Sequence, residues 1–302
     1  MTLQQRIEAN GLESINANFK TFENLLFDFI NQDVQELNNE LKQDANIILQ
    51  MIFTKVVTLH KSFEGISFET QEYKLNNILD PVVIASISRT IYEAIGFFHL
   101  LYIYHQDEKT ELIHKLWISS GLKYRQKFSG VLSNEGKDKL LKEKSSIDNI
   151  RLSIENLAVY KKASPKNKKV IIDNLTSKEF KLDLNNAKFK KITFTDLLSY
   201  MEYKPSFYPD LYSLFSLNSH PSYISLIQFR DMFSADQPAF KSLAEHYAHI
   251  CFYLLGVFVK DYLQIFPSCK SRFDKLSDVE QKFINFCSTF FRGEKYAIKN
   301  FE

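Results

Sequence analysis

The chain has 302 residues, 45% apolar and 14% aromatic, so it is long enough to bury a large core and is neither disordered nor of low complexity. Its 38 basic and 36 acidic residues give a formal charge of +2, too balanced to indicate nucleic-acid binding by overall charge. The N-terminus lacks a signal-peptide core, the longest uncharged run near the C-terminus is 14 residues, and three scattered cysteines exclude a disulfide framework. We therefore expect a cytoplasmic protein without a membrane partner.

The first part of the chain shows the residue spacing of amphipathic helices. Apolar residues recur at helical intervals from residue 12 to about residue 64. The spacing predicts one long helix, or two helices with a break near Asn31. Gly65 follows this stretch, as expected of a residue that terminates a helix.

A second helix has a clear start signal at Asp80 and Pro81. An aspartate can cap free backbone amides, and proline suits the first helical turn. The helix is expected to run to about His105, and because it is apolar on most sides we place it at the centre of the fold. The next helix is shorter and is expected to end at Gly121.

The composition then changes, because lysines cluster and apolar spacing thins over residues 122–192. We interpret this stretch as a peripheral, Lys-rich helical insertion. It is expected to hold one helix near 136–162, a short helix near 165–175 and a short extended piece within 180–192.

Helices resume after the insertion. They are expected at residues 195–201, 209–219, 221–233, 238–266 and 277–291. Strand-like alternation is almost absent, so the predicted fold is all-α, a helical bundle forming a single domain over residues 1–302. The two most apolar helices, 81–105 and 239–266, are expected to pack together.

Two charged residues stand out within the central apolar helix. Arg89 and Glu93 are four residues apart and therefore share one helix face. Their apolar surroundings predict that both are buried, and a buried guanidinium needs partners. A structural ion pair that fixes helix packing and a functional pair are equally compatible with this pattern.

The expected partner is the hydroxyl-rich segment 212–222. Tyr212, Ser216 and His220 are spaced by four residues, which places them on one face if the helix continues. Pro221 disfavours helix at the preceding residue, so His220 is expected at a break between two helices. There it serves either a helix-capping turn or acid–base chemistry.

Metal and cofactor signals are weak. His246 and His249 are three residues apart, and Glu111 with His114 supplies only half of a di-iron signature. The sequence has no P-loop, His-Glu-x-x-His, Gly-x-Ser-x-Gly or dinucleotide fingerprint. We therefore expect no cofactor and no metal.

Two short motifs carry a resemblance. They are the run from Ser86 to Glu93 and, well downstream, the residues Tyr212, Ser216, His220 and Ser222. This pattern resembles a family of uncharacterised bacterial helical proteins, defined only as a domain of unknown function. More distantly it is similar to HEPN-type domains, many of which are ribonucleases of toxin–antitoxin and phage-defence systems. The resemblance covers residues 20–120 and 195–265.

The resemblance implies a module that binds or cleaves RNA without a metal. His220 would be the acid–base group, Arg89 would stabilise phosphate charge and Glu93 would orient Arg89. The substrate-binding residues implied are Tyr92, Tyr212, Ser216 and Ser222. One departure matters, because no arginine here has a histidine four to six residues later on the same helix, as active HEPN ribonucleases do.

Two other function classes stay open at this point. One is a non-catalytic interaction module, with the exposed face of the first helix as the partner surface. The other is a metal-dependent enzyme that uses His246, His249 and Glu111. A homodimer is expected by analogy with HEPN-type domains.

Overall fold

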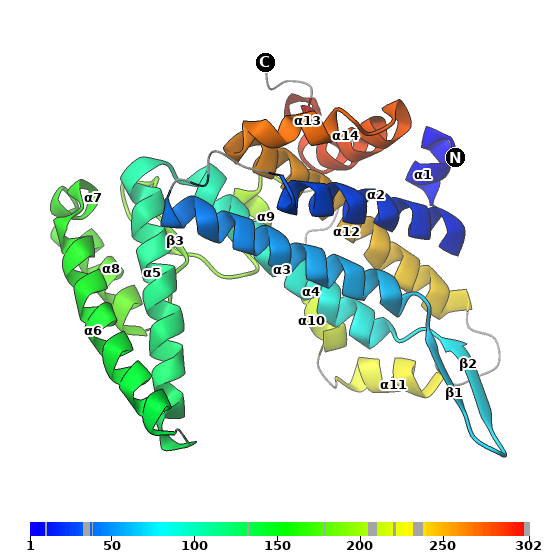
Figure 1. Ribbon diagram of the computed structural model, residues 1–302, viewed down its shortest axis with the longest axis horizontal. Coiled ribbons are helices and arrows are strands. Elements are labelled where there is room, and N and C mark those ends of the chain that lie inside the picture. The colour runs from blue at the N-terminus through cyan, green and yellow to red at the C-terminus, as the bar shows by residue number, and fades with distance from the viewer. Residues whose placement is uncertain are drawn as a thin grey trace. The chain divides into compact units, whose positions relative to one another are not determined.

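The computed structural model describes residues 1–9, 11–32, 37, 39–131, 133–177, 179–204, 210–219, 222–231 and 238–298. The chain is mostly helical, which confirms the predicted all-α class, and it divides into two compact units (Figure 1). Unit 1 combines Met1–His99 with Leu197–Glu302, and unit 2 is Leu100–Asp196. The Lys-rich stretch 122–192 therefore lies inside unit 2, which begins earlier than that stretch.

Unit 1 is built mainly of long helices. Its helices are α1 (Leu3–Glu8), α2 (Leu12–Ile30), α3 (Glu40–Ser62), α4 (Pro81–His99), α9 (Leu197–Tyr200), α10 (Leu211–Ser219), α11 (Tyr223–Asp231), α12 (Pro238–Ile265), α13 (Lys270–Phe273) and α14 (Asp278–Arg292). Its shorter elements are β1 (Ile66–Glu69), β2 (Lys74–Ile78) and the 3₁₀ turns η3 (Pro267–Cys269) and η4 (Glu294–Tyr296).

The predicted helix boundaries of the N-terminal part are confirmed. Helix α2 ends at Ile30, and Asn31 is its C-terminal cap. Helix α4 begins at Pro81, and one carboxylate oxygen of Asp80 accepts hydrogen bonds from the amides of Val82 and Val83, at 2.9 and 3.2 Å. Local capping chemistry therefore sets where the central helix starts.

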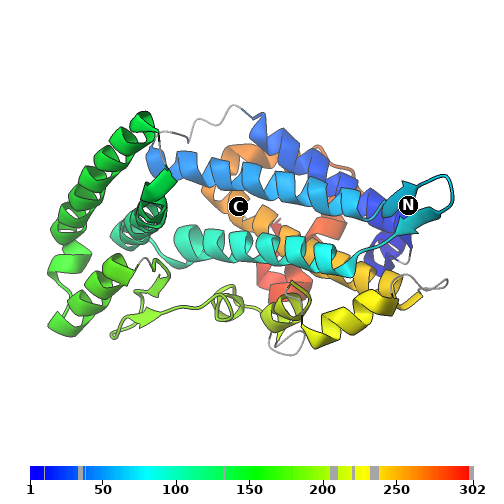
Figure 2. The ribbon, with the colours of Figure 1, turned by 90° about the horizontal axis from the view of Figure 1, so that it is seen from below.

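The core of unit 1 forms where α4 and α12 pack together, as predicted (Figures 1 and 2). The rings of Phe98 and Phe258 meet edge to face, with centroids 5.0 Å apart. Helix α14 packs on α12 at Gly256, where an added Cβ would lie only 2.6 Å from the Cβ of Cys287. Glycine at this position therefore permits the close approach of the two helices.

A β-hairpin in unit 1 was not predicted. Strands β1 and β2 pair antiparallel, with Ile66 opposite Ile78 and Phe68 opposite Leu75. All four residues of β1 are exposed, so the strand lacks the buried side that makes a strand pattern readable. The hairpin was missed because four alternating residues are too short a signal.

Unit 2 contains the Lys-rich helices and a second, very small sheet. Its elements are the π-helical turn η1 (Leu100–Tyr104), α5 (Asp107–Arg125), the 3₁₀ segment η2 (Gln126–Val131), α6 (Asn134–Asn156), α7 (Ala158–Lys161), α8 (Pro165–Ser177), β3 (Leu182–Asp183) and β4 (Lys190–Lys191). The predicted helix near 165–175 and the extended piece within 180–192 are confirmed.

Two predicted boundaries in unit 2 are wrong. Helix α5 continues through Gly121 to Arg125, because Gly121 lacks the positive φ with which a glycine ends a helix. The helix expected over 136–162 is two helices, since Leu157 between α6 and α7 has an extended backbone.

A neutral histidine anchors the start of unit 2. His105 is fully buried, its Nδ1 lies 2.8 Å from the carbonyl oxygen of Leu100, and its Nε2 accepts a hydrogen bond of 3.2 Å from the amide of Leu184. Burial lowers the pKa of His105 to about 4. The ring therefore joins two distant backbone segments as an uncharged donor and acceptor.

Two segments of the described chain are long and apolar enough to cross a membrane, judged by length and composition alone. They are Pro81–Tyr104 and Lys241–Ile265, whose most apolar windows are 56% and 67% buried within the fold. The central helices of a helical bundle pass the same test, and α4 and α12 are the helices at the core of unit 1.

Candidate functional site

The predicted Arg89–Glu93 pair forms on α4. Arg89 Nε donates to Glu93 Oε1 over 2.9 Å, and the side chains of the two residues are 22% and 25% exposed. The expectation that both are buried is wrong. Val83 and Thr90 of the same helix are exposed, so the helix has a solvent-facing side. The pair lies at the border between that side and the core.

Tyr212 joins the pair from α10, a helix 123 residues later in the sequence. Arg89 Nη2 donates to the Tyr212 hydroxyl over 2.5 Å, and the guanidinium carbon lies 4.8 Å from the centre of the same ring. Burial alone would lower the pKa of Arg89, but the hydrogen bond and charge of Glu93, together with Tyr212, outweigh it and raise that pKa. The guanidinium is thus a permanent, oriented cation.

The aromatic residues beside this cluster form its support. Tyr92 is fully buried, with its ring centre 6.0 Å from that of Tyr212 and 6.3 Å from that of Phe215. Ser216 follows Tyr212 by one turn of α10 and is half-buried. Tyr92 was predicted to bind substrate, and its full burial makes it part of the hydrophobic packing below the cluster.

The end of the predicted segment contains a helix cap. Ser222 Oγ accepts a 3.0 Å hydrogen bond from the amide of Ser225 and donates to the carbonyl of Leu217 at 3.1 Å. Ser222 therefore caps the start of α11, although it was predicted to bind substrate. His220 lies outside the described residues, between the end of α10 at Ser219 and the start of α11.

A buried charge cluster in unit 1 was missed by sequence reasoning. Asp261 on α12 accepts from Arg292 on α14 at 2.7 and 3.1 Å, and it lies 2.7 Å from Nδ1 of His99 on α4. Arg292 also donates to the carbonyl of Met201 over 2.6 Å. A signal was available, because Asp261 comes directly after Lys260 at the end of the uncharged run from His246 to Val259.

This cluster joins helices and is closed to ligands. The side chains of His99, Asp261 and Arg292 are at most 5% exposed. Burial alone would raise the pKa of Asp261, but the charges of Arg292 and His99 outweigh it and lower that pKa to about 2. The Asp261 carboxylate therefore stays ionised, and its contacts hold α4, α12 and α14 in register.

The histidines considered for a metal site do not gather enough ligands. Burial lowers the pKa of His246, and burial followed by the charge of His246 lowers that of His249. Glu111 lies in unit 2 and pairs with Lys115 at 3.3 Å. Among the residues that the structure describes, no three His, Cys, Asp or Glu side chains are grouped as a metal site requires.

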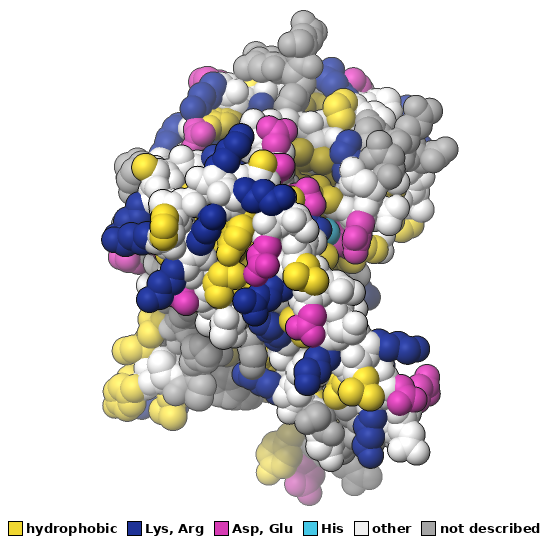
Figure 3. Space-filling view, turned by 90° about the vertical axis from the view of Figure 1, so that its left-hand side faces the viewer, with side chains coloured by type: hydrophobic (Ala, Val, Ile, Leu, Met, Phe, Trp, Pro, Cys, Tyr) yellow, Lys and Arg dark blue, Asp and Glu magenta, His cyan; other side chains and the backbone are white. Residues whose placement is uncertain are grey.

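Charge is distributed unevenly between the two units. Unit 2 has 20 Lys and Arg against 12 Asp and Glu, a formal charge of +8, whereas unit 1 has 18 against 24, a formal charge of −6. Figure 3 faces α6, α7 and α8, and Lys and Arg side chains are spread across that view. The overall charge of +2 therefore conceals one basic and one acidic unit.

Comparison with known proteins places the chain in a family. The model of a family of unknown function, DUF5677, matches residues 76–238, which is more than half of the chain. The match spans α4, unit 2, α10 and α11, and so includes Arg89, Glu93 and Tyr212. It ends at Pro238, the first residue of α12, and leaves α14 outside. No curated protein and no solved structure matches the chain, and the comparisons give no link to HEPN domains. The chain belongs to the DUF5677 family of unknown function.

Proposed function

We propose that this protein binds RNA through unit 2. The observation that carries the proposal is the formal charge of +8 on unit 2 in a chain whose total is only +2. Nucleic-acid affinity depends largely on the neutralisation of phosphates by Lys and Arg and the release of their counterions. Because the basic charge is gathered in unit 2, that effect is concentrated in one part of the chain.

The basic residues of unit 2 are placed where a phosphate backbone can reach them. Eight lysines on or next to α6, α7 and α8 are exposed: Lys137, Lys139, Lys142, Lys144, Lys161, Lys162, Lys166 and Lys169. Tyr124 and Phe128 in the same unit are each 58% exposed, with ring centres 5.9 Å apart. Exposed aromatic rings near lysines suit single-stranded RNA, whose bases stack on them.

The Arg89 cluster of unit 1 is our separate candidate for a reaction on RNA. Arg89 is a permanent cation held from two helices by Glu93 and Tyr212, and its side chain is 22% exposed. A fixed guanidinium can stabilise the charge of a phosphodiester under attack. The resemblance to bacterial defence ribonucleases implies that His220 is the acid–base group. The proposed reaction is RNA cleavage in the cytoplasm.

The binding proposal is tested by fluorescence anisotropy with a labelled single-stranded RNA, at salt concentrations from 50 to 200 mM. The double variant K162E/K166E should lower the affinity at least tenfold and flatten the salt dependence. The matched control, K61E/K275E, makes the same charge change at exposed lysines of unit 1 and should change affinity far less. Equal losses in both variants, or no binding by the wild type, would contradict the proposal.

The reaction is tested separately with total RNA and tRNA. Wild-type protein should produce fragments, and the variants R89K and H220A should not, while both keep RNA binding. Lysine keeps the positive charge but loses the two-pronged guanidinium, so R89K tests geometry more than charge. If the wild-type protein leaves the RNA intact, the proposed cleavage is contradicted and only RNA binding remains.

A second candidate function is protein interaction, as first expected for the exposed face of the first long helix. Phe27 on α2 is 52% exposed, and Ile47 and Met51 on α3 are 49% and 47% exposed. The ring of Phe27 lies 5.6 Å from that of Phe53, which joins the two helices into one apolar surface. Light scattering over a range of protein concentrations, on the wild type and F27S/M51S, tests whether a second copy binds there.

A further inference from the structure

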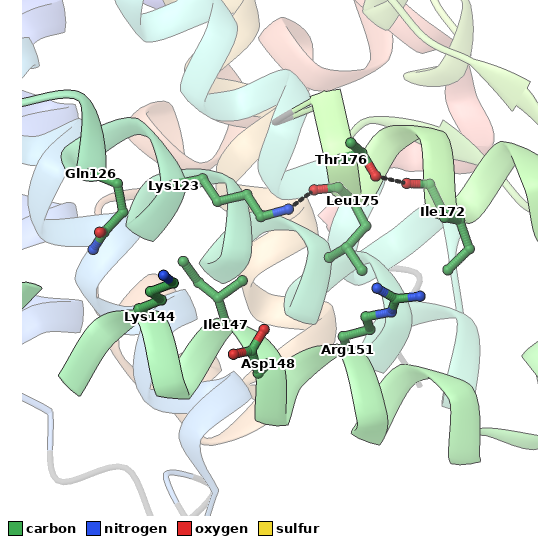
Figure 4. Close-up of a pocket in the computed structure, with 9 residues that line it drawn as sticks. All are labelled: Lys123, Gln126, Lys144, Ile147, Asp148, Arg151, Ile172, Leu175 and Thr176. Atoms are coloured by element: carbon green, nitrogen blue, oxygen red, sulfur yellow. Dashed lines mark hydrogen bonds between the residues drawn. The ribbon is translucent and has the colours of Figure 1, made fainter. Parts of the chain in front are cut away.

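Unit 2 contains a cavity between α5, α6 and α8 whose lining combines cations with an apolar floor (Figure 4). Its volume is about 390 Å³, within the range of small-molecule sites. The lining residues are Lys123, Gln126, Lys144, Ile147, Asp148, Arg151, Ile172, Leu175 and Thr176. No function of unit 2 so far uses this cavity.

Two of the cations, Lys144 and Arg151, are available to a ligand, and the third, Lys123, links two helices. Lys123 Nζ donates to the carbonyl of Leu175 and so joins α5 to α8. Lys144 is exposed and forms no ion pair with the described residues. Arg151 uses its Nε for Glu155, at 3.2 Å, and this leaves the outer edge of its guanidinium toward the cavity, as Figure 4 shows.

The spacing along α6 places these groups on one side of the helix. Lys144, Ile147, Asp148 and Arg151 follow one another at intervals of three, one and three residues, which is the pattern of a single helix face. A cation therefore stands at each end of the row, with an apolar side chain and one carboxylate between them. Ile172 of α8 faces the row from across the cavity and is half-buried.

We propose that this cavity binds a nucleoside phosphate, an inference that rests on and deepens the proposed RNA binding. The phosphate lies between Lys144 and Arg151, where an ammonium and a guanidinium both donate to its oxygens. The base packs on Ile147 and Ile172, and the Asp148 carboxylate accepts from ribose hydroxyls. Three cations against one carboxylate give the cavity a net positive charge, which an anionic ligand neutralises.

The same chemistry has two sources, a free mononucleotide or one residue of an RNA strand. The probe for the first is AMP, measured by isothermal titration calorimetry, with adenosine and inorganic phosphate as partial probes. The probe for the second is a 5′-phosphorylated hexanucleotide RNA. Displacement of AMP by the hexanucleotide identifies an RNA residue as the occupant, and AMP binding that the hexanucleotide does not displace identifies a free nucleotide.

The test compares variants on the two sides of α6. K144A and R151A should each weaken AMP binding at least tenfold, and adenosine should bind weakly even to the wild type. K142A and K139A remove the same charge from exposed positions of the same helix that do not line the cavity, and they should leave AMP binding within twofold. All four positions are exposed, so the variants are expected to fold, which circular dichroism checks.

The inference is overturned if neither AMP nor the hexanucleotide binds saturably, or if K144A and R151A bind no more weakly than K142A and K139A. That outcome is distinct from failure of the proposed function. RNA binding that K162E/K166E weakens, together with AMP binding that K144A and R151A do not weaken, would overturn the cavity and keep the basic unit. AMP binding without any RNA binding would keep the cavity and overturn the proposed function.

Discussion

The two units use ionisable side chains in opposite ways. Unit 1 is acidic overall but places three ionisable side chains, His99, Asp261 and Arg292, in its interior, where each has a partner. Unit 2 is basic, and its lysines lie mostly in solvent. Buried charges act on the few groups in direct contact with them, whereas exposed charges act through their sum. The first arrangement positions helices, and the second is suited to attract a polyanion.

The largest expected effect comes from breaking the buried trio. R292A leaves the Asp261 carboxylate buried without its main partner, so the free energy of unfolding should fall by about 3–5 kcal/mol. Urea unfolding followed by circular dichroism measures this. K282A, which removes an exposed ion pair with Asp278, is the control and should change stability little. Similar losses in the two variants would contradict the contrast between buried and exposed charges.

Acidification should destabilise unit 2 before unit 1, because the pKa of His105 in unit 2 is lowered. Between pH 6.5 and about 4 the unfolded chain takes up a proton at this histidine and the folded chain does not, so stability falls as the pH falls. The shift corresponds to a loss on the order of 3 kcal/mol. Asp261 in unit 1 instead contributes stability above its ordinary pKa, which is lost only as the pH falls toward about 2.

The single tryptophan allows the stability of unit 2 to be measured apart from that of unit 1. Trp117 lies on α5 in unit 2, so its fluorescence reports unit 2, whereas circular dichroism reports mainly the larger unit 1. From pH 7 to pH 5 the urea midpoint should fall more by fluorescence than by circular dichroism. H105Q should be less stable at pH 7 but should lose this pH dependence. A wild-type midpoint that is the same at both pH values would rule out the role of His105.

A smaller effect is expected where α12 and α14 approach most closely. G256A places a methyl group against the Cβ of Cys287 and the backbone nitrogen of Ser288, at 2.6 and 2.8 Å. Overpacking of this kind should cost about 1–3 kcal/mol in urea unfolding. G121A is the matched control on α5, where the added Cβ meets open space, and it should be neutral or slightly stabilising.

The smallest effect on stability is expected at the lysines of unit 2. K161A and K169A, at exposed positions of α7 and α8, should change the free energy of unfolding by no more than about 0.5 kcal/mol. A larger loss of unfolding free energy would mean that these lysines stabilise the fold. It would weaken the interpretation that the lysines of unit 2 serve to attract a polyanion.

Much of the secondary structure could be predicted from the sequence because its causes are local. The Asp80 cap, the Pro81 start and the break at Asn31 each depend on a few neighbouring residues. The extended piece within 180–192 is likewise confirmed. The hairpin of β1 and β2 was missed because β1 is short and exposed along its whole length. Gly121 was misread because an exposed glycine is tolerated within a helix.

The candidate site could be predicted only in part. The sequence indicated that Arg89 and Glu93 share a helix face, and the structure adds Tyr212 from α10 at hydrogen-bond distance. The degree of burial was wrong, because the composition of one helix does not say which of its sides a neighbour covers. His220, whose role depends on the turn around it, lies outside the described residues.

The sequence by itself determined the helical class, most helix starts and the concentration of lysines between residues 122 and 192, since each depends on local composition or capping. Tertiary structure alone decided that His99, Asp261 and Arg292 meet, that Gly256 lies against α14, and that cations of α6 border a cavity. These contacts join residues far apart along the chain. Their partners are set by the packing of whole helices, which no local signal encodes.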